Sequence, residues 1–161
     1  MTTTPTPASP GAALTDADVR TLLDAATHAA AALPDHGFAT CVVDAGGHVL
    51  GLLRAVDATV AAAHSAETKA RTAVWLGADT GALPPTSPAV PAMVSGLPFP
   101  VNVFEGGLLL RRHGLVVGAL GVAGSPVPGH DLAVARTALE RAGLAHDHPG
   151  TPGRQVPPTT R

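Results

Sequence analysis

Aromatic side chains are scarce in this chain of 161 residues, which has no tyrosine, one tryptophan and three phenylalanines. The four rings are Phe38, Trp75, Phe99 and Phe104. So few rings leave little surface on which a flat ligand or a nucleic-acid base can stack. Apolar residues still make up 45% of the sequence, many of them alanine. We therefore predict a close-packed aliphatic core.

Cysteine and lysine each occur once. Cys41 has no second thiol with which to form an internal disulfide, and its place in the apolar run FATCVVD favours a buried structural thiol over a nucleophile. Lys69 is the only side-chain amine.

Charge of either sign is also sparse, with a formal net charge of -2 and scattered arginines. No broad positive field attracts nucleic acid or anionic lipid, so we expect neither as a partner. The sequence MTTTPTPASPGAA has no signal-peptide pattern, and no apolar run reaches the length of a membrane span. We predict a soluble cytoplasmic protein without a membrane partner.

The length predicts one domain. Residues 1–13 and 146–161 are rich in Pro, Thr and Gly without hydrophobic periodicity, and we expect flexible tails there. Residues 14–145 form the predicted domain. Thr15 is placed to cap its first helix, with Asp18 in the first turn.

The rest of the domain alternates strand-like and helical segments. FATCVVD and HVLGLLR, joined by AGG, predict an antiparallel hairpin. Residues 58–76 are helical in pattern, and six prolines in residues 79–100 predict an irregular rim with one short turn of helix. VNVF, GLLLRR and LVVGALGVAG are three further strand-like runs, and Asp131 opens a last helix that ends at Gly143.

The last strand-like run, LVVGALGVAG, contains Gly118 and Gly121 and ends at Gly124. A dinucleotide fingerprint has a different spacing and leads directly into a helix, so these glycines do not indicate a phosphate site. Glycine inside a strand marks a position that another backbone or a ligand approaches closely.

Three stretches together resemble the GlcG/HbpS-like family of small haem-binding proteins: VVDAGGHVLGLLRAVDA, SAETKARTAVWLG, and FEGGLLLRRHGLVVGALGVAGSP followed by Asp. The resemblance implies an α+β, profilin-like layered domain with an antiparallel five-stranded sheet and packed helices. It also implies a homo-oligomer of dimers that build hexamers or octamers. Haem is the cofactor it suggests, with the ligand site at Lys69, Thr72, Glu105, Gly106 and Gly107.

The residues themselves leave two interpretations open at each of three positions. Lys69 is placed either to meet a ligand carboxylate or to extend its ammonium into water at the sheet edge. Thr72 either faces the same pocket or bonds back to its own helix. Arg54 either binds an acid group or pairs with Asp57, and helix capping accounts for Asp131.

Glu105 is the main candidate for acid or base chemistry, because we expect a carboxylate between an apolar strand and two glycines to be poorly solvated. His113, at a hairpin turn, is a second candidate for proton transfer, and His64 is a candidate iron ligand. Each histidine has an ordinary surface position as its alternative. The eight histidines show no zinc-site spacing.

Two functions follow. The first is a cytoplasmic protein that binds haem, or a similar planar acid-bearing molecule, in an apolar pocket between helix 58–76 and the turn Glu105–Gly107. The second is a cofactor-independent isomerase or cyclase of specialised metabolism, in which Glu105 or His113 moves a proton.

Overall fold

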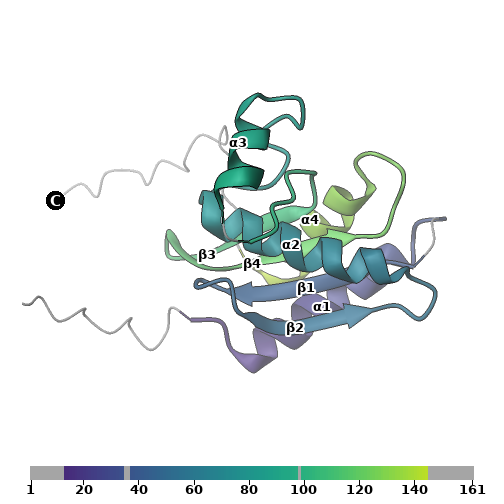
Figure 1. The fold of residues 1–161 in the computed structure, drawn as a ribbon. Coiled ribbons are helices and arrows are strands. Elements are labelled where there is room, and N and C mark those ends of the chain that lie inside the picture. The colour runs from purple at the N-terminus through teal and green to yellow at the C-terminus, as the bar shows by residue number, and fades with distance from the viewer. Residues whose placement is uncertain (1–12, 35–36, 98, 145–161) are drawn as a thin grey trace, which may run out of the picture.

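The computed structural model describes residues 13–34, 37–97 and 99–144 (Figure 1). Apart from Ala13, the predicted tails at 1–13 and 146–161 include none of these residues. The elements in chain order are α1 (Asp16–Ala30), β1 (Ala39–Asp44), β2 (Val49–Arg54), α2 (Val60–Leu76), α3 (Ala89–Gly96), β3 (Gly107–Arg112), β4 (Leu115–Ala123) and α4 (His130–Ala142).

The sheet is antiparallel and has four strands in the order β2-β1-β4-β3. The predicted fifth strand, VNVF at 101–104, is wrong. The backbone N–H of Asn102 donates to Thr72 Oγ1 at 3.0 Å, and that of Phe104 donates to the Asn102 side chain at 3.1 Å. These amides bond to side chains and not to a neighbouring strand, so the segment remains irregular.

The fold has three layers, with two separate hydrophobic cores between them. Helices α1 and α4 cover one face of the sheet and α2 covers the other (Figure 1). The first core is built from larger side chains such as Leu22, Leu110 and Leu139. The second is mostly alanine and brings α2 close to the sheet through Ala66, Ala70 and Ala73. The predicted aliphatic core is confirmed.

Helix ends follow the local chemistry that the sequence indicated. The Thr15 side chain accepts from the Asp18 amide, and the Asp18 carboxylate accepts from the Thr15 amide at 2.7 Å, which satisfies two otherwise unpaired donors. Thr59 caps α2, and Gly77 ends it in the left-handed conformation. No helix among the described residues is long and apolar enough to cross a bilayer.

The β4 glycines make room for neighbouring backbone. A Cβ atom on Gly121 would overlap the carbonyl oxygen of Ala66 and lie 2.8 Å from the nitrogen of Ala70. Gly118 faces the Val43 carbonyl in the same way. The close approach predicted for this strand is therefore that of α2 at Gly121 and of β1 at Gly118.

Cys41 is fully buried under α2, and burial raises the pKa of its thiol to about 12. Because the thiolate is the reactive form, we expect alkylation of the native protein at mildly alkaline pH to be on the order of a thousandfold slower than that of a free thiol. Iodoacetamide labelling, followed by mass spectrometry with and without urea, measures the ratio. Native labelling at the rate of the urea-unfolded chain would contradict the buried position.

Candidate functional site

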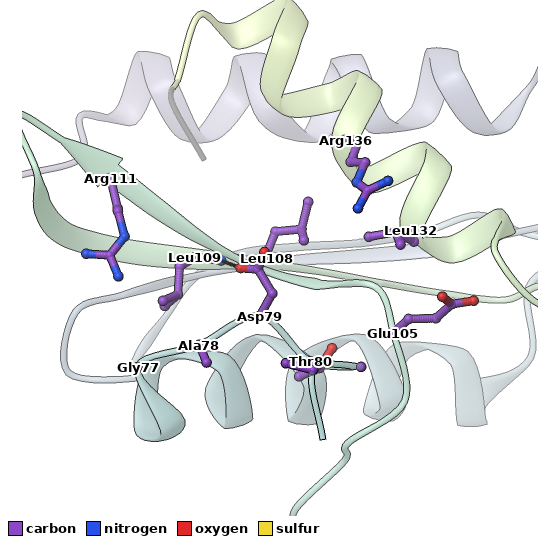
Figure 2. A pocket seen from close by; sticks show the side chains of 12 residues that line it. Gly77, Ala78, Asp79, Thr80, Glu105, Leu108, Leu109, Arg111, Leu132 and Arg136 are labelled. Atoms are coloured by element: carbon purple, nitrogen blue, oxygen red, sulfur yellow. Dashed lines mark hydrogen bonds between the residues drawn. The ribbon is translucent and has the colours of Figure 1, made fainter. Parts of the chain in front are cut away.

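Two cavities meet at the turn that precedes β3. The larger, about 800 Å³, lies between the first half of α2, the segment 103–105 and the loop 123–128. The smaller, about 460 Å³, lies between the loop 77–82 that follows α2, β3 and α4 (Figure 2). Glu105 and Gly81 line both, so the two cavities adjoin at these residues.

Lys69 points from α2 toward the floor of the larger cavity. Its Nζ lies 2.6 Å from Asp131 Oδ2 and donates to the Val122 carbonyl at 3.1 Å. The residue is 3% exposed, so the interpretation in which its ammonium reaches water is wrong. The positive charge is already neutralised inside the protein.

Asp131 serves this ion pair and does not cap α4. The N-cap residue is Gly129, which has no side chain with which to cap the helix. One carboxylate oxygen of Asp131 accepts from the Lys69 ammonium, and the other accepts from the Ser125 amide at 3.2 Å. The predicted capping role is wrong because the carboxylate turns toward α2 and thereby ties α4, the loop after β4 and α2 together.

Gly106 and Gly107 allow the chain to pass close to α2 beside Lys69. Gly106 has φ +111°, and a Cβ there would lie 2.6 Å from the Val122 oxygen and 3.3 Å from Lys69 Nζ. A Cβ on Gly107 would lie 2.6 Å from the Lys69 carbonyl oxygen. Any larger residue would push this turn away from the ion pair.

Glu105 lines both cavities, and Figure 2 shows its side chain among the residues of the smaller one. Its side chain is half-buried, and its Oε1 accepts from the Gly129 amide. The carboxylate therefore connects the turn before β3 to the start of α4, and it also borders both cavities. This position makes it accessible to a ligand in either cavity.

Thr72 and Ser65, both on α2, hold Asn102 in place at the rim of the larger cavity. Thr72 Oγ1 accepts from the Asn102 amide, and the Asn102 side-chain nitrogen donates to Ser65 Oγ at 2.9 Å. Thr72 is 1% exposed and Ser65 lines the cavity. Thr72 thus fixes the position of residues 101–104, and Ser65 presents its hydroxyl to the cavity.

The smaller cavity combines leucines with two arginines and two carboxylates. Leu108 and Arg111 come from β3, and Leu132 and Arg136 from α4 (Figure 2). Asp79 Oδ1 accepts from the Leu109 amide at 2.8 Å. Thr80 likewise accepts from the Gly107 amide at 2.8 Å, so the loop after α2 binds the outer edge of β3.

Three candidate residues lie away from this cluster. Arg54 donates to the Ala58 carbonyl and borders a different cavity of about 550 Å³ between α1 and β2. His113 is exposed in the turn between β3 and β4, with φ 53°. His64 is exposed on α2 and lines neither of the two adjoining cavities. Within the described part of the chain, no three His, Cys, Asp or Glu side chains gather as a metal site.

The sequence matches the family model described as "Haem degrading protein HbpS-like" over residues 14–140. The chain belongs to the HbpS-like family. The resemblance carried by the three sequence stretches is thereby confirmed. No curated protein matches the sequence.

Solved structures share the HbpS-like fold. The structure of a PduOC:haem complex superposes with a TM-score of 0.74 at 29% identity, over 84% of this chain and 99% of that chain. HbpS superposes with a TM-score of 0.65 at 28% identity, over 87% and 97%. Protein ORFY of Klebsiella pneumoniae has a TM-score of 0.74 at 24% identity, over 88% and 98%, which indicates the fold alone.

Sequence reasoning missed some of the residues that shape the site. Arg136 belongs to an amphipathic helix pattern, where a charged residue ordinarily faces water, and no local motif distinguishes it. Asp79 and Thr80 fell within the proline-rich rim, whose irregular backbone gives no periodic signal. Contacts between residues far apart in sequence place all three in this HbpS-like site.

Proposed function

We propose that this HbpS-like chain binds a flat, largely apolar molecule that bears an acid group, and holds its body in the larger cavity. The walls support this proposal, since alanines of α2 face Val103, Phe104 and Val127 across the space. A cavity of about 800 Å³ falls in the size range of small-molecule sites. The Lys69–Asp131 pair and Ser65 supply a polar floor and edge.

Haem is the first candidate, because the PduOC neighbour is a haem complex and the family model carries haem in its description. The apolar walls suit the body of a porphyrin. None of the described residues that line this cavity is a histidine, cysteine or methionine, so these residues offer the iron no nitrogen or sulfur ligand of the usual haem kind. The cavity therefore fits the macrocycle better than it fits the metal.

Homo-oligomeric assembly and a cytoplasmic location, both expected from the sequence, belong to the same proposal. A row of apolar side chains on β2 supports assembly: Val49, Leu50, Leu52 and Leu53 are 40% to 45% exposed. Neighbouring side chains such as Leu52 and Leu53 point to opposite faces of this edge strand, and exposed apolar side chains at a sheet edge favour contacts between proteins.

The enzyme alternative rests on Glu105, the carboxylate that borders both cavities. A proton donor or acceptor must reach the reacting atom, and Glu105 satisfies this for a substrate in either cavity. His113 follows the opposite end of β3, about 20 Å along the strand, and lines neither cavity. If the protein is an isomerase or cyclase, Glu105 is its acid or base.

Titration with haemin and with metal-free protoporphyrin IX tests the proposal. We expect saturable binding of both at micromolar concentration, seen as a Soret shift for haemin and a fluorescence change for the porphyrin. Ala61→Phe places a ring on an exposed helix position that lines the larger cavity, and it should weaken both at least about tenfold.

His64→Phe is the matched control, because it puts the same ring on the same helix outside the cavity. Loss of haemin binding alone in this variant would instead assign His64 to the iron. Failure of both compounds to bind the unmodified protein would remove the proposal. Recovery of chemically altered ligand, detected by mass spectrometry after incubation, would favour the enzyme alternative.

A further inference from the structure

A third cavity, of about 550 Å³, lies between the second half of α1, the segment that follows this helix, and β2. Its size is ordinary for a small-molecule site. None of its described lining residues lines the two cavities beside Glu105. Most of its wall is apolar and comes from Ala26, Ala30, Ala31, Phe38 and Leu53.

Thr40 supplies a polar group inside this apolar wall. On β1, Val42 belongs to the core under α1, whereas Cys41 belongs to the core under α2. Because side chains alternate along a strand, the Thr40 side chain points to the α1 face, where the cavity lies. Thr40 is only 4% exposed, so its hydroxyl is held within the protein.

The Thr40 hydroxyl makes no hydrogen bond with any residue that the structure describes. It is not among the unpartnered side-chain atoms that are sealed from solvent, so it is reached from the cavity. Thr27 lines the same cavity, but its hydroxyl donates to the Leu23 carbonyl at 2.8 Å. A buried hydroxyl without a partner is unfavourable, and a molecule in the cavity that bonds to Thr40 would remove this cost.

The charges of the described lining, Arg54 and Asp57, sum to zero. Arg54 is the register partner of Ala39, whose side chain lies in the core under α2. The Arg54 guanidinium accordingly donates to the Ala58 carbonyl, at the start of the segment that leads into α2. Asp57 is exposed. Neither charge is buried in the apolar wall, which therefore suits a neutral molecule.

We propose that the cavity between α1 and β2 is a second binding site, for a small, neutral, mainly apolar molecule whose one hydroxyl group bonds to Thr40. A threonine hydroxyl both donates and accepts, so it can pair with such a group. The site goes beyond the proposed function, because it shares no described residue with the porphyrin cavity.

The test compares 2-naphthol with 2-methylnaphthalene, which replaces the hydroxyl by a methyl group of similar size. Fluorescence titration gives the affinity of each compound, and the ratio of the two affinities measures the preference for the hydroxyl. Thr40→Val keeps the shape of the side chain and should lower this ratio about fivefold, as expected for one hydrogen bond. Thr27→Val is the matched control and should leave the ratio unchanged, because its hydroxyl already donates within α1.

A second pair of variants locates the site. Ala31 and Ala32 are neighbouring exposed residues, and only Ala31 lines the cavity. Ala31→Phe should weaken 2-naphthol at least about tenfold, whereas Ala32→Phe should not. Ala61→Phe, which narrows the porphyrin cavity, should leave 2-naphthol binding intact.

Three results would overturn the inference. The first is failure of 2-naphthol to bind the unmodified protein at millimolar concentration, a result that needs no variant to fold. The second is an unchanged affinity ratio in Thr40→Val, which would mean that water alone satisfies the hydroxyl. The third is loss of 2-naphthol binding in Ala61→Phe but not in Ala31→Phe, which would place the compound in the porphyrin cavity. Each result is independent of whether porphyrins bind.

Discussion

Lys69→Met is expected to lower the free energy of unfolding by about 3 to 5 kcal/mol, because it leaves the Asp131 carboxylate in a nearly dry position without its cation. The 2.6 Å contact joins α2 to α4 across 62 residues of sequence, so its loss acts on the whole fold. Urea denaturation followed by circular dichroism measures the change.

A second variant separates the ion pair from simple packing. Lys69→Met combined with Asp131→Leu replaces both charges by apolar groups of similar size, and such replacements are often close to neutral. We expect the double variant to recover most of the stability that Lys69→Met loses. If Lys69→Met lowers the free energy of unfolding by less than about 1 kcal/mol, water reaches the ion pair, and this result would contradict its burial.

Gly121→Val should destabilise the protein by more than about 3 kcal/mol or prevent soluble expression. A side chain at this position meets the backbone of α2 at Ala66 and Ala70, and backbone cannot rotate away as a flexible side chain can. The helix must move off the sheet, which also displaces Lys69 from Asp131. Thermal melting and size-exclusion chromatography report the outcome.

Gly96→Ala is the corresponding control. No atom of the described residues lies within 4 Å of a Cβ at Gly96, and the residue ends the short helix α3 without a positive φ. This variant should stay within about 0.5 kcal/mol of the unmodified protein. A soluble Gly121→Val protein with an unchanged melting temperature would contradict the close contact between β4 and α2.

Local chemistry predicted most of the fold. The reciprocal bonds of Thr15 and Asp18 were visible as a capping pattern, and α2 ends at Leu76, where the helical pattern of residues 58–76 predicted its end. The prediction of a fifth strand was wrong, and hydrophobic periodicity does not reveal the reason. The apolar alternation of VNVF satisfies a strand pattern, but its amides bond to Thr72 and to Asn102 itself, and such partners are known only after α2 is placed.

The candidate site was predicted in part. Lys69, Glu105, Gly106 and Gly107 come together beside the cavities, at the place that the family resemblance implied. The role of Asp131 was not foreseen, because capping is a local pattern whereas its actual partner is 62 residues away in sequence. Arg54, His113 and His64 were singled out by residue type and local position, and the topology places them outside the two adjoining cavities.

A crystal structure of the protein with bound protoporphyrin IX tests the central claim most directly, because it locates the ligand. The macrocycle is expected in the larger cavity, between Ser65, Phe104 and Val127. A porphyrin bound elsewhere, for example in the cavity between α1 and β2, would contradict the account.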